Sequence, residues 1–301
     1  MSRIAFIFPG QGAQKCGMGK DFYENTEIGR SVFDRASELL GFSMPELCFE
    51  ENDRLDITEY TQAAMVTASI AMMEVLKARG VKPDVAAGLS LGEYCALVAA
   101  GVMSADDAIS TVRQRGILMQ EAVPVGLGAM AAILALDASK IEEVISAIDG
   151  VSIANYNCPG QIVISGRKEA VEAANEKLLE AGAKRAVLLN VSGPFHSAML
   201  AEAGRKLGEV LADARINTPV IPYVANVTAQ YVTKAEDVRP LLERQVSSSV
   251  RWQQSVETML QDGVDTFIEI GPGKTLAGFM RKITRDVKVI NIEKLEDIEK
   301  L

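Results

Sequence analysis

The sequence predicts an α/β protein in which a large domain with a mostly parallel sheet carries a small inserted α+β domain. Two observations lead to this prediction. In both outer parts of the chain, short apolar runs alternate with helical patterns, which is typical of a parallel sheet covered on both faces. The middle part follows the order strand-helix-strand-strand-helix-strand, which is ferredoxin-like. Glycines at its ends place the large domain at residues 1–125 and 194–301 and the small domain at 126–193.

The first part of the large domain opens with a short apolar strand at Ile4–Phe8, which Pro9 and Gly10 end. The stretch from residue 61 to 79 is apolar almost all round, so it predicts a buried helix. The further elements expected here are the strand Asp84–Gly88 and the helices Thr61–Arg79, Glu93–Ala100 and Ser104–Glu121.

The inserted domain has the clearest alternation of short β-type runs and amphipathic stretches. Its expected strands are Ala129–Leu136, Val151–Asn155, Gln161–Ser165 and Arg185–Val191, and its expected helices are Ala138–Ile148 and Glu169–Ala181.

The rest of the large domain again alternates strands and helices. The charged tail at Glu293–Leu301 is expected to fray. The elements expected before it are the helices Ser197–Ala212, Ala235–Gln245, Trp252–Gln261 and Thr275–Ile283 and the strands Tyr223–Ala225 and Thr266–Ile270.

Composition excludes several classes of protein. The net charge is −9 and no run of five Lys or Arg occurs, so nucleic acid and anionic membranes are not expected partners. The four cysteines have no C-x-x-C spacing, which favours free thiols over disulfides or a metal site. The longest apolar stretch without charge, residues 60–73, is too short to span a membrane. We therefore expect a cytoplasmic protein.

A candidate nucleophile lies in the sequence Gly88-Leu89-Ser90-Leu91-Gly92, between an expected strand and an expected helix. This is the setting of the nucleophile elbow, and it makes the large domain α/β-hydrolase-like. The two glycines permit a tight turn that exposes the serine hydroxyl near a helix N-terminus. A plain strand-to-helix turn is the alternative.

The chain has a single histidine, His196, so the base that a reactive serine needs can only be this residue if a Ser–His pair exists. A packed or solvated histidine is the alternative. No acid stands out as the third member of a triad, and chain order differs from that of ordinary α/β-hydrolases. We expect a dyad whose imidazole is oriented by an amide or a carbonyl.

Arg115 falls near the apolar stripe of its helix, together with Ala108, Val112 and Met119. An inward guanidinium needs an anionic partner. That partner is either a structural salt bridge or the carboxylate of a substrate, which Arg can bind in bidentate fashion. Arg113 points further round the helix and is expected to be a solvated charge.

Glycines flank Gln11 in Phe8-Pro9-Gly10-Gln11-Gly12 and leave its N–H free to act as an oxyanion donor. Neither this turn nor Gly271-Pro272-Gly273 matches a dinucleotide or P-loop fingerprint, so no cofactor is expected.

Together these segments resemble the malonyl-CoA:acyl carrier protein transacylase family of bacterial fatty-acid synthesis, which is related to polyketide acyltransferase domains. The likeness spans nearly the whole chain, and it rests on five segments in the same order: Phe8-Pro9-Gly10-Gln11-Gly12, Gly88-Leu89-Ser90-Leu91-Gly92-Glu93-Tyr94, Gln114-Arg115-Gly116, Pro194-Phe195-His196-Ser197 and Glu269-Ile270-Gly271-Pro272-Gly273.

The resemblance implies a role for each candidate. Ser90 is expected to be the acylated nucleophile, with His196 as general acid and base. The amides of Gln11 and Leu91 are expected to form the oxyanion hole, and Arg115 is expected to bind the malonate carboxylate. The substrates implied are malonyl-CoA and acyl carrier protein, with coenzyme A thioester as a substrate and not a cofactor.

Further positions follow from the same resemblance. Gln245 resembles the glutamine that orients the histidine, and Met119 and Asn155 resemble pocket neighbours. Leu89 departs from the family, which usually has histidine before the serine; we expect activity to survive with altered packing there. A monomer is expected.

Two other functions stay open at this point: a serine thioesterase or hydrolase, or a polyketide-type acyltransferase with another acyl preference. A non-catalytic module that binds a carrier protein is a third. Because carrier proteins are acidic, docking needs a local basic face. The candidates are Lys274, Arg281, Lys282 and Arg285, for which solvated helix charges are the alternative.

Overall fold

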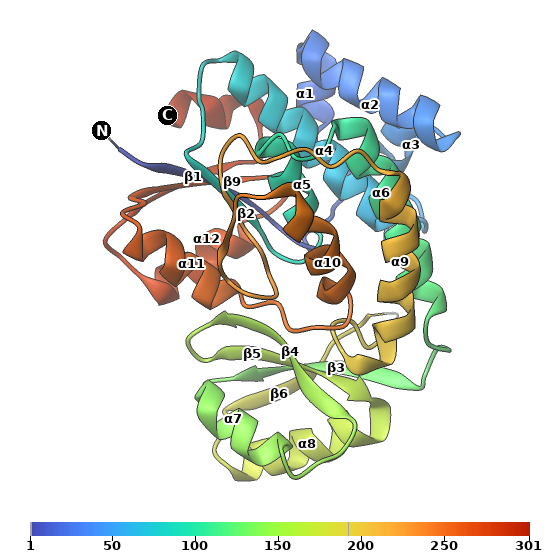
Figure 1. Cartoon of the computed structure of the whole chain (residues 1–301), viewed down its shortest axis with the longest axis vertical. Helices are drawn as coiled ribbons and strands as arrows, with labels where there is room; N and C mark the ends of the chain where they lie inside the picture. Colours follow the sequence, from blue (N-terminus) through green and yellow to red (C-terminus); the bar gives the residue numbers. More distant parts are fainter. Residues whose placement is uncertain (1, 192) are drawn as a thin grey trace.

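The computed structural model describes residues 2–191 and 193–301, which fold around two β-sheets (Figure 1). The larger sheet has the strand order β10-β9-β1-β2-β7-β8, and the smaller has the order β4-β5-β3-β6. The strands of the larger sheet are Ile4–Phe8 (β1), Val85–Gly88 (β2), Tyr223–Val224 (β7), Tyr231–Val232 (β8), Thr266–Ile270 (β9) and Lys288–Ile292 (β10).

The larger sheet is mostly parallel, as the sequence predicts. Its neighbouring strands pair in parallel except β7 and β8, which are antiparallel. In β1 the side chains alternate between two buried clusters: Phe6 and Phe8 belong to one, and Ala5 and Ile7 to the other. Both faces of the sheet are therefore covered, which explains why its central strands are apolar throughout.

Helices supply the two clusters. The larger cluster collects side chains of α4, α5, α6, α9 and α10, and the smaller one those of α11 and α12. The helices of this part of the chain are Lys20–Asn25 (α1), Glu27–Leu40 (α2), Met44–Phe49 (α3), Thr58–Ala78 (α4), Gly92–Ala99 (α5), Ala105–Glu121 (α6), Ala201–Asp213 (α9), Ala235–Gln245 (α10), Trp252–Gln261 (α11) and Thr275–Ile283 (α12).

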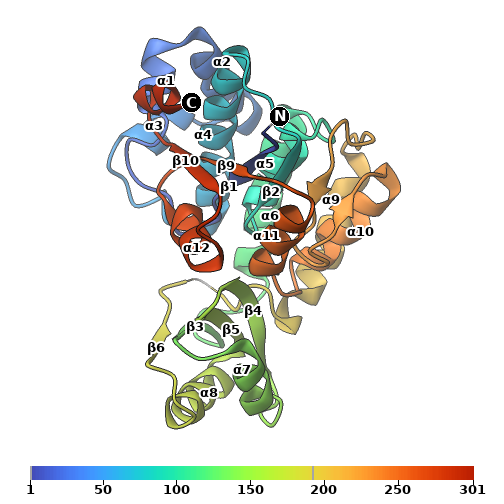
Figure 2. The same cartoon turned by 90° about the vertical axis from the view of Figure 1, so that its left-hand side faces the viewer.

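The smaller sheet lies below the larger one in Figures 1 and 2 and is antiparallel throughout. One face packs against its two helices through Ile133, Ile164 and Leu178. The other face contributes Met130 and Val163 to the core of the large sheet. The elements are Gly128–Leu134 (β3), Ala138–Ile145 (α7), Val151–Cys158 (β4), Gln161–Arg167 (β5), Lys168–Glu180 (α8) and Arg185–Leu188 (β6).

Several details differ from the sequence expectations. The tail does not simply fray: Leu295–Lys300 forms a 3-10 helix (η2), in which Leu295 and Ile298 pack on the large core. The helix expected from Ser197 is split into a 3-10 turn at Ala198–Leu200 (η1) followed by α9. Helices α1 to α3 and strands β8 and β10 were not anticipated.

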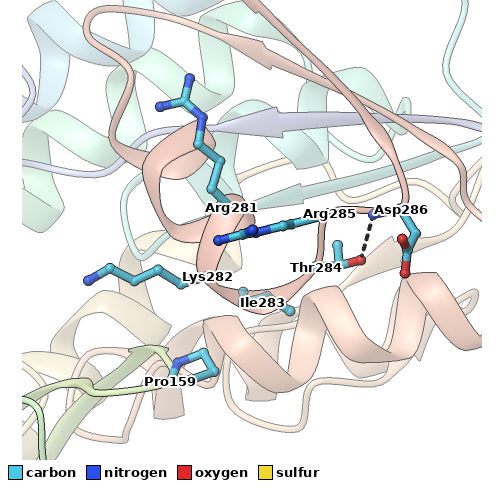
Figure 3. Close-up of a pocket in the computed structure, with 7 residues that line it drawn as sticks. All are labelled: Pro159, Arg281, Lys282, Ile283, Thr284, Arg285 and Asp286. Carbon is cyan, nitrogen blue, oxygen red and sulfur yellow. Dashed lines mark hydrogen bonds between the residues drawn. The ribbon is translucent and has the colours of Figure 1, made fainter.

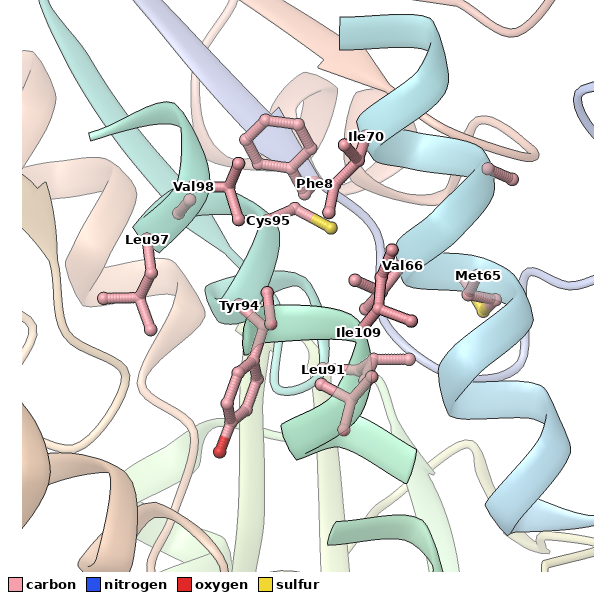
Figure 4. Close-up of a cluster of buried hydrophobic side chains, with 14 of the residues drawn as sticks. Phe8, Met65, Val66, Ile70, Leu91, Tyr94, Cys95, Leu97, Val98 and Ile109 are labelled. Atoms are coloured by element: carbon pink, nitrogen blue, oxygen red, sulfur yellow. The ribbon is translucent and has the colours of Figure 1, made fainter. Parts of the chain in front are cut away.

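Helix α5 is buried along its whole length, which matters because it follows the candidate nucleophile. Figure 4 shows Leu91, Tyr94 and Cys95 of this helix region packed among side chains that include Phe8 and Val66. A helix buried on all sides has little freedom to shift. Among the described residues, no helix is both long and apolar enough to cross a bilayer.

Candidate active site

Ser90 lies in a sharp turn between β2 and α5, with a φ of 51° in the left-handed region. Gly88 and Gly92 must be glycines because other backbone atoms lie too close to them for a side chain. A Cβ on Gly88 would lie 2.0 Å from the carbonyl carbon of Gly92, and a Cβ on Gly92 would lie 2.2 Å from the Phe8 oxygen. The spacing of the motif thus follows from the geometry of the turn, which holds the serine partly exposed.

The structure brings Ser90 and His196 together across 106 positions of the chain, with the Ser90 Oγ 2.7 Å from the His196 Nε2. The ring is 4% exposed. Its Nδ1 lies 2.8 Å from the backbone carbonyl oxygen of Gln245. Because a carbonyl only accepts, Nδ1 carries the proton and Nε2 is free to accept one from the serine hydroxyl.

The pKa of His196 is lowered to about 4, chiefly by burial and also by the positive charge of Arg115. Hydrogen bonds to backbone carbonyls oppose this shift only in part. The imidazole is therefore neutral at pH 7, the state in which it can act as a base.

Arg115 is buried, with 1% of its surface exposed. Its Nη1 donates to the Gln62 Oε1 at 2.8 Å, and its Nη2 donates to the Gln245 Oε1 at 3.0 Å and to the Ser90 Oγ at 3.3 Å. Among residues 2–191 and 193–301, its Nε has no hydrogen-bond partner. In the described part of the chain Arg115 makes no ion pair, so the structural salt bridge considered above is wrong.

Arg113, unlike Arg115, forms an ion pair, so it is not simply a solvated charge. It pairs with Glu59 at 2.5 Å and lies over the ring of Tyr60. Arg115 is thus the guanidinium of this helix that faces neutral amides beside the serine. Burial lowers its pKa, the direction expected for a cation whose charge is not fully compensated.

The imidazole is hydrogen-bonded by the backbone carbonyl of Gln245, and the side chain of Gln245 makes no hydrogen bond to it. The side-chain Nε2 of Gln245 donates to the Ser90 carbonyl at 2.9 Å and to the Glu93 Oε2 at 2.7 Å, while its Oε1 accepts from Arg115. The amide therefore separates a buried carboxyl from a buried guanidinium. Burial raises the pKa of Glu93 to about 7, against the effect of its hydrogen-bond donors and of Arg115.

Gln11 and Leu91 follow the carboxyl ends of the neighbouring strands β1 and β2, in which Phe8 pairs with Gly88. In the described residues, neither backbone N–H has a hydrogen-bond acceptor within the protein. The side chain of Gln11 is tied to its surroundings through Thr58, at 3.3 Å, and Gln62, at 3.4 Å. An oxyanion site requires N–H groups without an acceptor in the protein, which both residues offer.

Met119 and Asn155 have different surroundings. Met119 is buried and its sulfur lies 3.6 Å from the Gln62 Nε2, so it borders the side chain that holds Arg115. Asn155 in β4 bridges to Val250, and its side chain makes no hydrogen bond to the other candidates. Leu89 packs against the smaller buried cluster of the large sheet.

Sequence reasoning did not identify Gln62, Glu93 or Asn226, all of which are buried and bonded to the site. Glu93 directly follows the serine motif, but an acid in the first turn of a helix ordinarily indicates a favourable surface charge. Gln62 lies in a buried stretch of α4, where an uncharged amide gives no distinct signal. Asn226 lies after the two-residue strand β7, where a lone amide likewise gives no distinct signal.

A separate hollow of about 570 Å³ lies at the end of α12, bordered by Pro159 of the β4–β5 turn (Figure 3). Arg281, Lys282 and Arg285 line it, and all are exposed. Lys282 also donates to Gln161 of the small sheet at 3.3 Å. Lys274 is not part of this group, because it precedes the first residue of α12.

Comparison with known proteins places these features in a family. The model of the acyl transferase domain matches residues 5–296. The chain belongs to the acyl transferase family. The malonyl CoA-acyl carrier protein transacylase of Bacillus subtilis is 48% identical to this acyl transferase over 99% of the chain and 96% of the relative. The resemblance drawn from the sequence is confirmed.

Similarity to solved structures agrees with this family assignment. An acyl carrier protein S-malonyltransferase from Vibrio cholerae shares 41% identity with this acyl transferase, covers 99% of both chains and gives a TM-score of 0.97. A malonyl-transacylase in complex with its type II polyketide synthase acyl-carrier protein shares 39% identity, with a TM-score of 0.96 and coverage of 99% of this chain and 98% of that one.

Proposed function

We propose that this acyl transferase moves a malonyl group from coenzyme A to the pantetheine thiol of acyl carrier protein in fatty acid biosynthesis. The names of its relatives support the substrates. The observation that carries the proposal is the 2.7 Å contact between Ser90 and His196, beside a buried Arg115 that has no carboxylate partner. A serine activated by a neutral imidazole performs acyl transfer, and a guanidinium without a carboxylate partner selects an acyl group that is itself an anion.

In the first half-reaction, the Ser90 oxygen attacks the thioester carbonyl carbon of malonyl-CoA while His196 Nε2 takes the hydroxyl proton. The carbonyl oxygen becomes an oxyanion that the N–H groups of Gln11 and Leu91 stabilise, each such donor being worth about 3–4 kcal/mol. The tetrahedral intermediate then expels coenzyme A, whose sulfur takes the proton from the imidazole. The product is a malonyl ester on Ser90.

In the second half-reaction, the pantetheine thiol of the carrier protein gives its proton to His196 and attacks the ester carbonyl. The same two amides stabilise the oxyanion. Collapse breaks the bond to Ser90, whose oxygen recovers the proton from the imidazole. The cycle is ping-pong, and it needs no residue beyond the Ser–His pair to transfer protons.

The malonyl carboxylate would bind Arg115. The guanidinium is held by Gln62 and Gln245 while its Nε lacks a partner, so it is oriented but not neutralised. An acetyl group would leave this buried charge without an anion, which costs binding free energy. Arg115 thus supports selection of malonyl over acetyl. Met119, one turn later on α6, and Asn155 on β4 are our candidates for neighbouring residues of the pocket.

Two structural interpretations belong with this proposal. We interpret residues 1–125 and 194–301 as an α/β-hydrolase-like catalytic domain and residues 126–193 as a ferredoxin-like domain. The basic residues Arg281, Lys282 and Arg285 are our candidates for docking the acidic carrier protein. A monomer without cofactor remains the prediction.

Intact-protein mass spectrometry after incubation with malonyl-CoA tests the proposed function. We expect one malonyl adduct on the wild-type chain and none on Ser90→Ala. Absence of the adduct from both would remove the acyl-enzyme mechanism. Release of free malonate without an acceptor thiol, at the rate of transfer, would instead support a thioesterase.

A further inference from the structure

The turn that carries Ser90 is held from outside by Asn226, a residue that follows β7 far along the chain. Its Oδ1 accepts the backbone N–H of Ser90 at 2.7 Å, and its Nδ2 donates to the carbonyl of Gly88 at 2.6 Å. Asn226 is fully buried. One amide side chain thus bonds the backbone on both sides of Leu89, in the way that a strand partner would.

This double contact falls where the backbone is strained. Ser90 adopts a φ of 51°, which is unfavourable for a residue with a Cβ and persists only when its surroundings fix it. The Ser90 N–H points to Asn226, and the next N–H, that of Leu91, is the proposed oxyanion donor. A rotation of the Ser90 peptide would move both the hydroxyl and that donor.

Asn226 is itself fixed at its backbone. Its N–H donates to the Glu93 Oε2 at 3.2 Å, and its carbonyl accepts from the Arg251 N–H at 3.0 Å. The same Glu93 oxygen accepts from the side chain of Gln245, whose backbone carbonyl bonds the imidazole. Glu93 therefore links the support of the serine with the support of the histidine.

We propose that Asn226 is a positioning residue that holds the Ser90 turn so that the hydroxyl faces His196 and the Leu91 N–H faces the oxyanion. This proposal rests on the proposed acyl transfer at Ser90. Asn226 makes no hydrogen bond to His196 or Arg115, so its loss should lower the rate of acylation and leave the binding of malonyl-CoA through Arg115 nearly unchanged.

The first test is Asn226→Ala, followed by single-turnover acylation and steady-state kinetics. Displacement of reacting groups by about 1 Å costs on the order of 100-fold in rate, so we expect kcat to fall by about that factor. The KM for malonyl-CoA should stay within about threefold. Asn52→Ala is the matched control: the Asn52 side chain also bonds both N–H and carbonyl groups of a turn, away from the serine. It should lower Tm but keep kcat.

The second test uses Asn226→Asp, which separates positioning from general stability. A protonated carboxyl has one donor and one acceptor, the same pattern that Asn226 presents to Gly88 and Ser90; the ionised form lacks the donor. Burial beside Glu93 raises the pKa of the introduced carboxyl. Glu93 titrates near pH 7 in both proteins, so we compare rates at equal pH and expect the ratio of the acylation rate of this variant to that of the wild type to rise by about tenfold between about pH 8 and pH 5.5.

Three results would overturn the proposal: a kcat for Asn226→Ala within about threefold of the wild type, a pH profile of Asn226→Asp parallel to that of the wild type, or an equal loss of kcat in Asn52→Ala. If Asn226→Ala does not fold, the pH profile of Asn226→Asp decides. If the wild type forms no malonyl adduct, the proposed function itself fails; if it does and the variants acylate equally fast, only the role of Asn226 fails.

Discussion

The imidazole of His196 and the guanidinium of Arg115 are two nitrogen-rich side chains buried beside the same hydroxyl. The electrostatic consequence is that the histidine stays neutral, since burial and the nearby cation both lower its pKa. The sequence could identify these residues because each is unusual by composition or by position: the chain has one histidine, and Arg115 falls on an apolar stripe. It could not identify Glu93, Gln62 and Asn226, whose closeness to the serine depends on tertiary packing.

The state of the imidazole predicts the pH dependence of acylation. With a folded-state pKa of about 4, His196 remains deprotonated from pH 8 down to about pH 5, so loss of the base through protonation should occur only as the pH approaches 4. Stopped-flow acylation across this range measures it. A fall in rate centred near the ordinary histidine pKa of about 6.5 would contradict the burial argument.

The same shift predicts stability. Between pH 6.5 and about 4 the unfolded chain binds a proton on the histidine that the folded protein does not, so this group lowers the free energy of unfolding as the pH falls. Glu93 acts in the opposite sense: its raised pKa, about 7, stabilises the folded state at low pH, and this contribution is lost as the pH rises through 7. Glu93→Gln removes this contribution, so the free energy of unfolding of the variant should fall more steeply than that of the wild type as the pH falls from about 7 to 4.5. Urea unfolding of both proteins at several pH values measures it, and identical pH slopes would contradict it.

Arg115 gives the specificity prediction. Arg115→Ala should lower kcat/KM for malonyl-CoA by about 100-fold, because it removes charge-assisted hydrogen bonds to the carboxylate. The ratio of kcat/KM for acetyl-CoA to kcat/KM for malonyl-CoA should therefore rise. Arg113→Ala, on the same helix but paired with Glu59, is the control and should keep the malonyl preference. Unchanged acyl preference in Arg115→Ala would exclude Arg115 from the substrate site.

At the scale of elements, the strand β1 and the buried helices α4 and α6 were predicted, whereas the amphipathic helix α2, with 14 residues, and the strand β10, with five, were missed. Strand β1 and helices α4 and α6 have apolar patterns long enough to be distinct. Helices α1 and α3 have six residues each, and strand β8 has two, so their patterns are too short to recognise. The tail was predicted to fray from its charges, but Leu295 and Ile298 bury its apolar side.

The turn between β2 and α5 gives a prediction at this scale. Gly92→Ala places a Cβ 2.2 Å from the Phe8 oxygen, a backbone atom that has no room to move, so we expect a loss of about 2 kcal/mol or more in the free energy of unfolding. Gly278→Ala in α12 is the control: it meets no atom within 4 Å and should be neutral or stabilise by about 0.5–1 kcal/mol. Urea unfolding measures both, and equal effects would show that the close approach is not limiting.

Helix α12 gives a second prediction. Reversing the charges at and just after its exposed end, in Lys282→Glu combined with Arg285→Glu, should raise the KM for carrier protein and leave acylation by malonyl-CoA unchanged, since only the second half-reaction involves the acidic partner. Transfer assays with the carrier protein as varied substrate measure this, with Lys168→Glu combined with Lys177→Glu on α8 as a charge-matched control. An unchanged KM for carrier protein would show that these cations do not take part in docking.

In the whole molecule, the candidate site lies where distant parts of the chain converge. Ser90 and Arg115 come from the first half of the chain, His196 follows the small sheet, and Gln245 ends α10. The segment after α10 is bonded to β4, through the Val250 N–H to Ala154 at 2.8 Å and the Tyr156 N–H to Val250 at 2.9 Å. The small sheet therefore supports the segment whose carbonyl orients the imidazole. Sequence reasoning placed the histidine at the exit of the small domain, but not this link.

The central claim is that Ser90 holds the malonyl group between the two substrates. The most direct measurement is a pulse and chase: the protein is incubated with malonyl-CoA, freed from excess, digested and analysed by mass spectrometry before and after addition of acyl carrier protein. We predict a malonyl group on the peptide containing Ser90 that disappears on the chase, with an equal amount of malonyl carrier protein formed. A malonyl group on another peptide, or one that the carrier protein does not remove, would contradict this account.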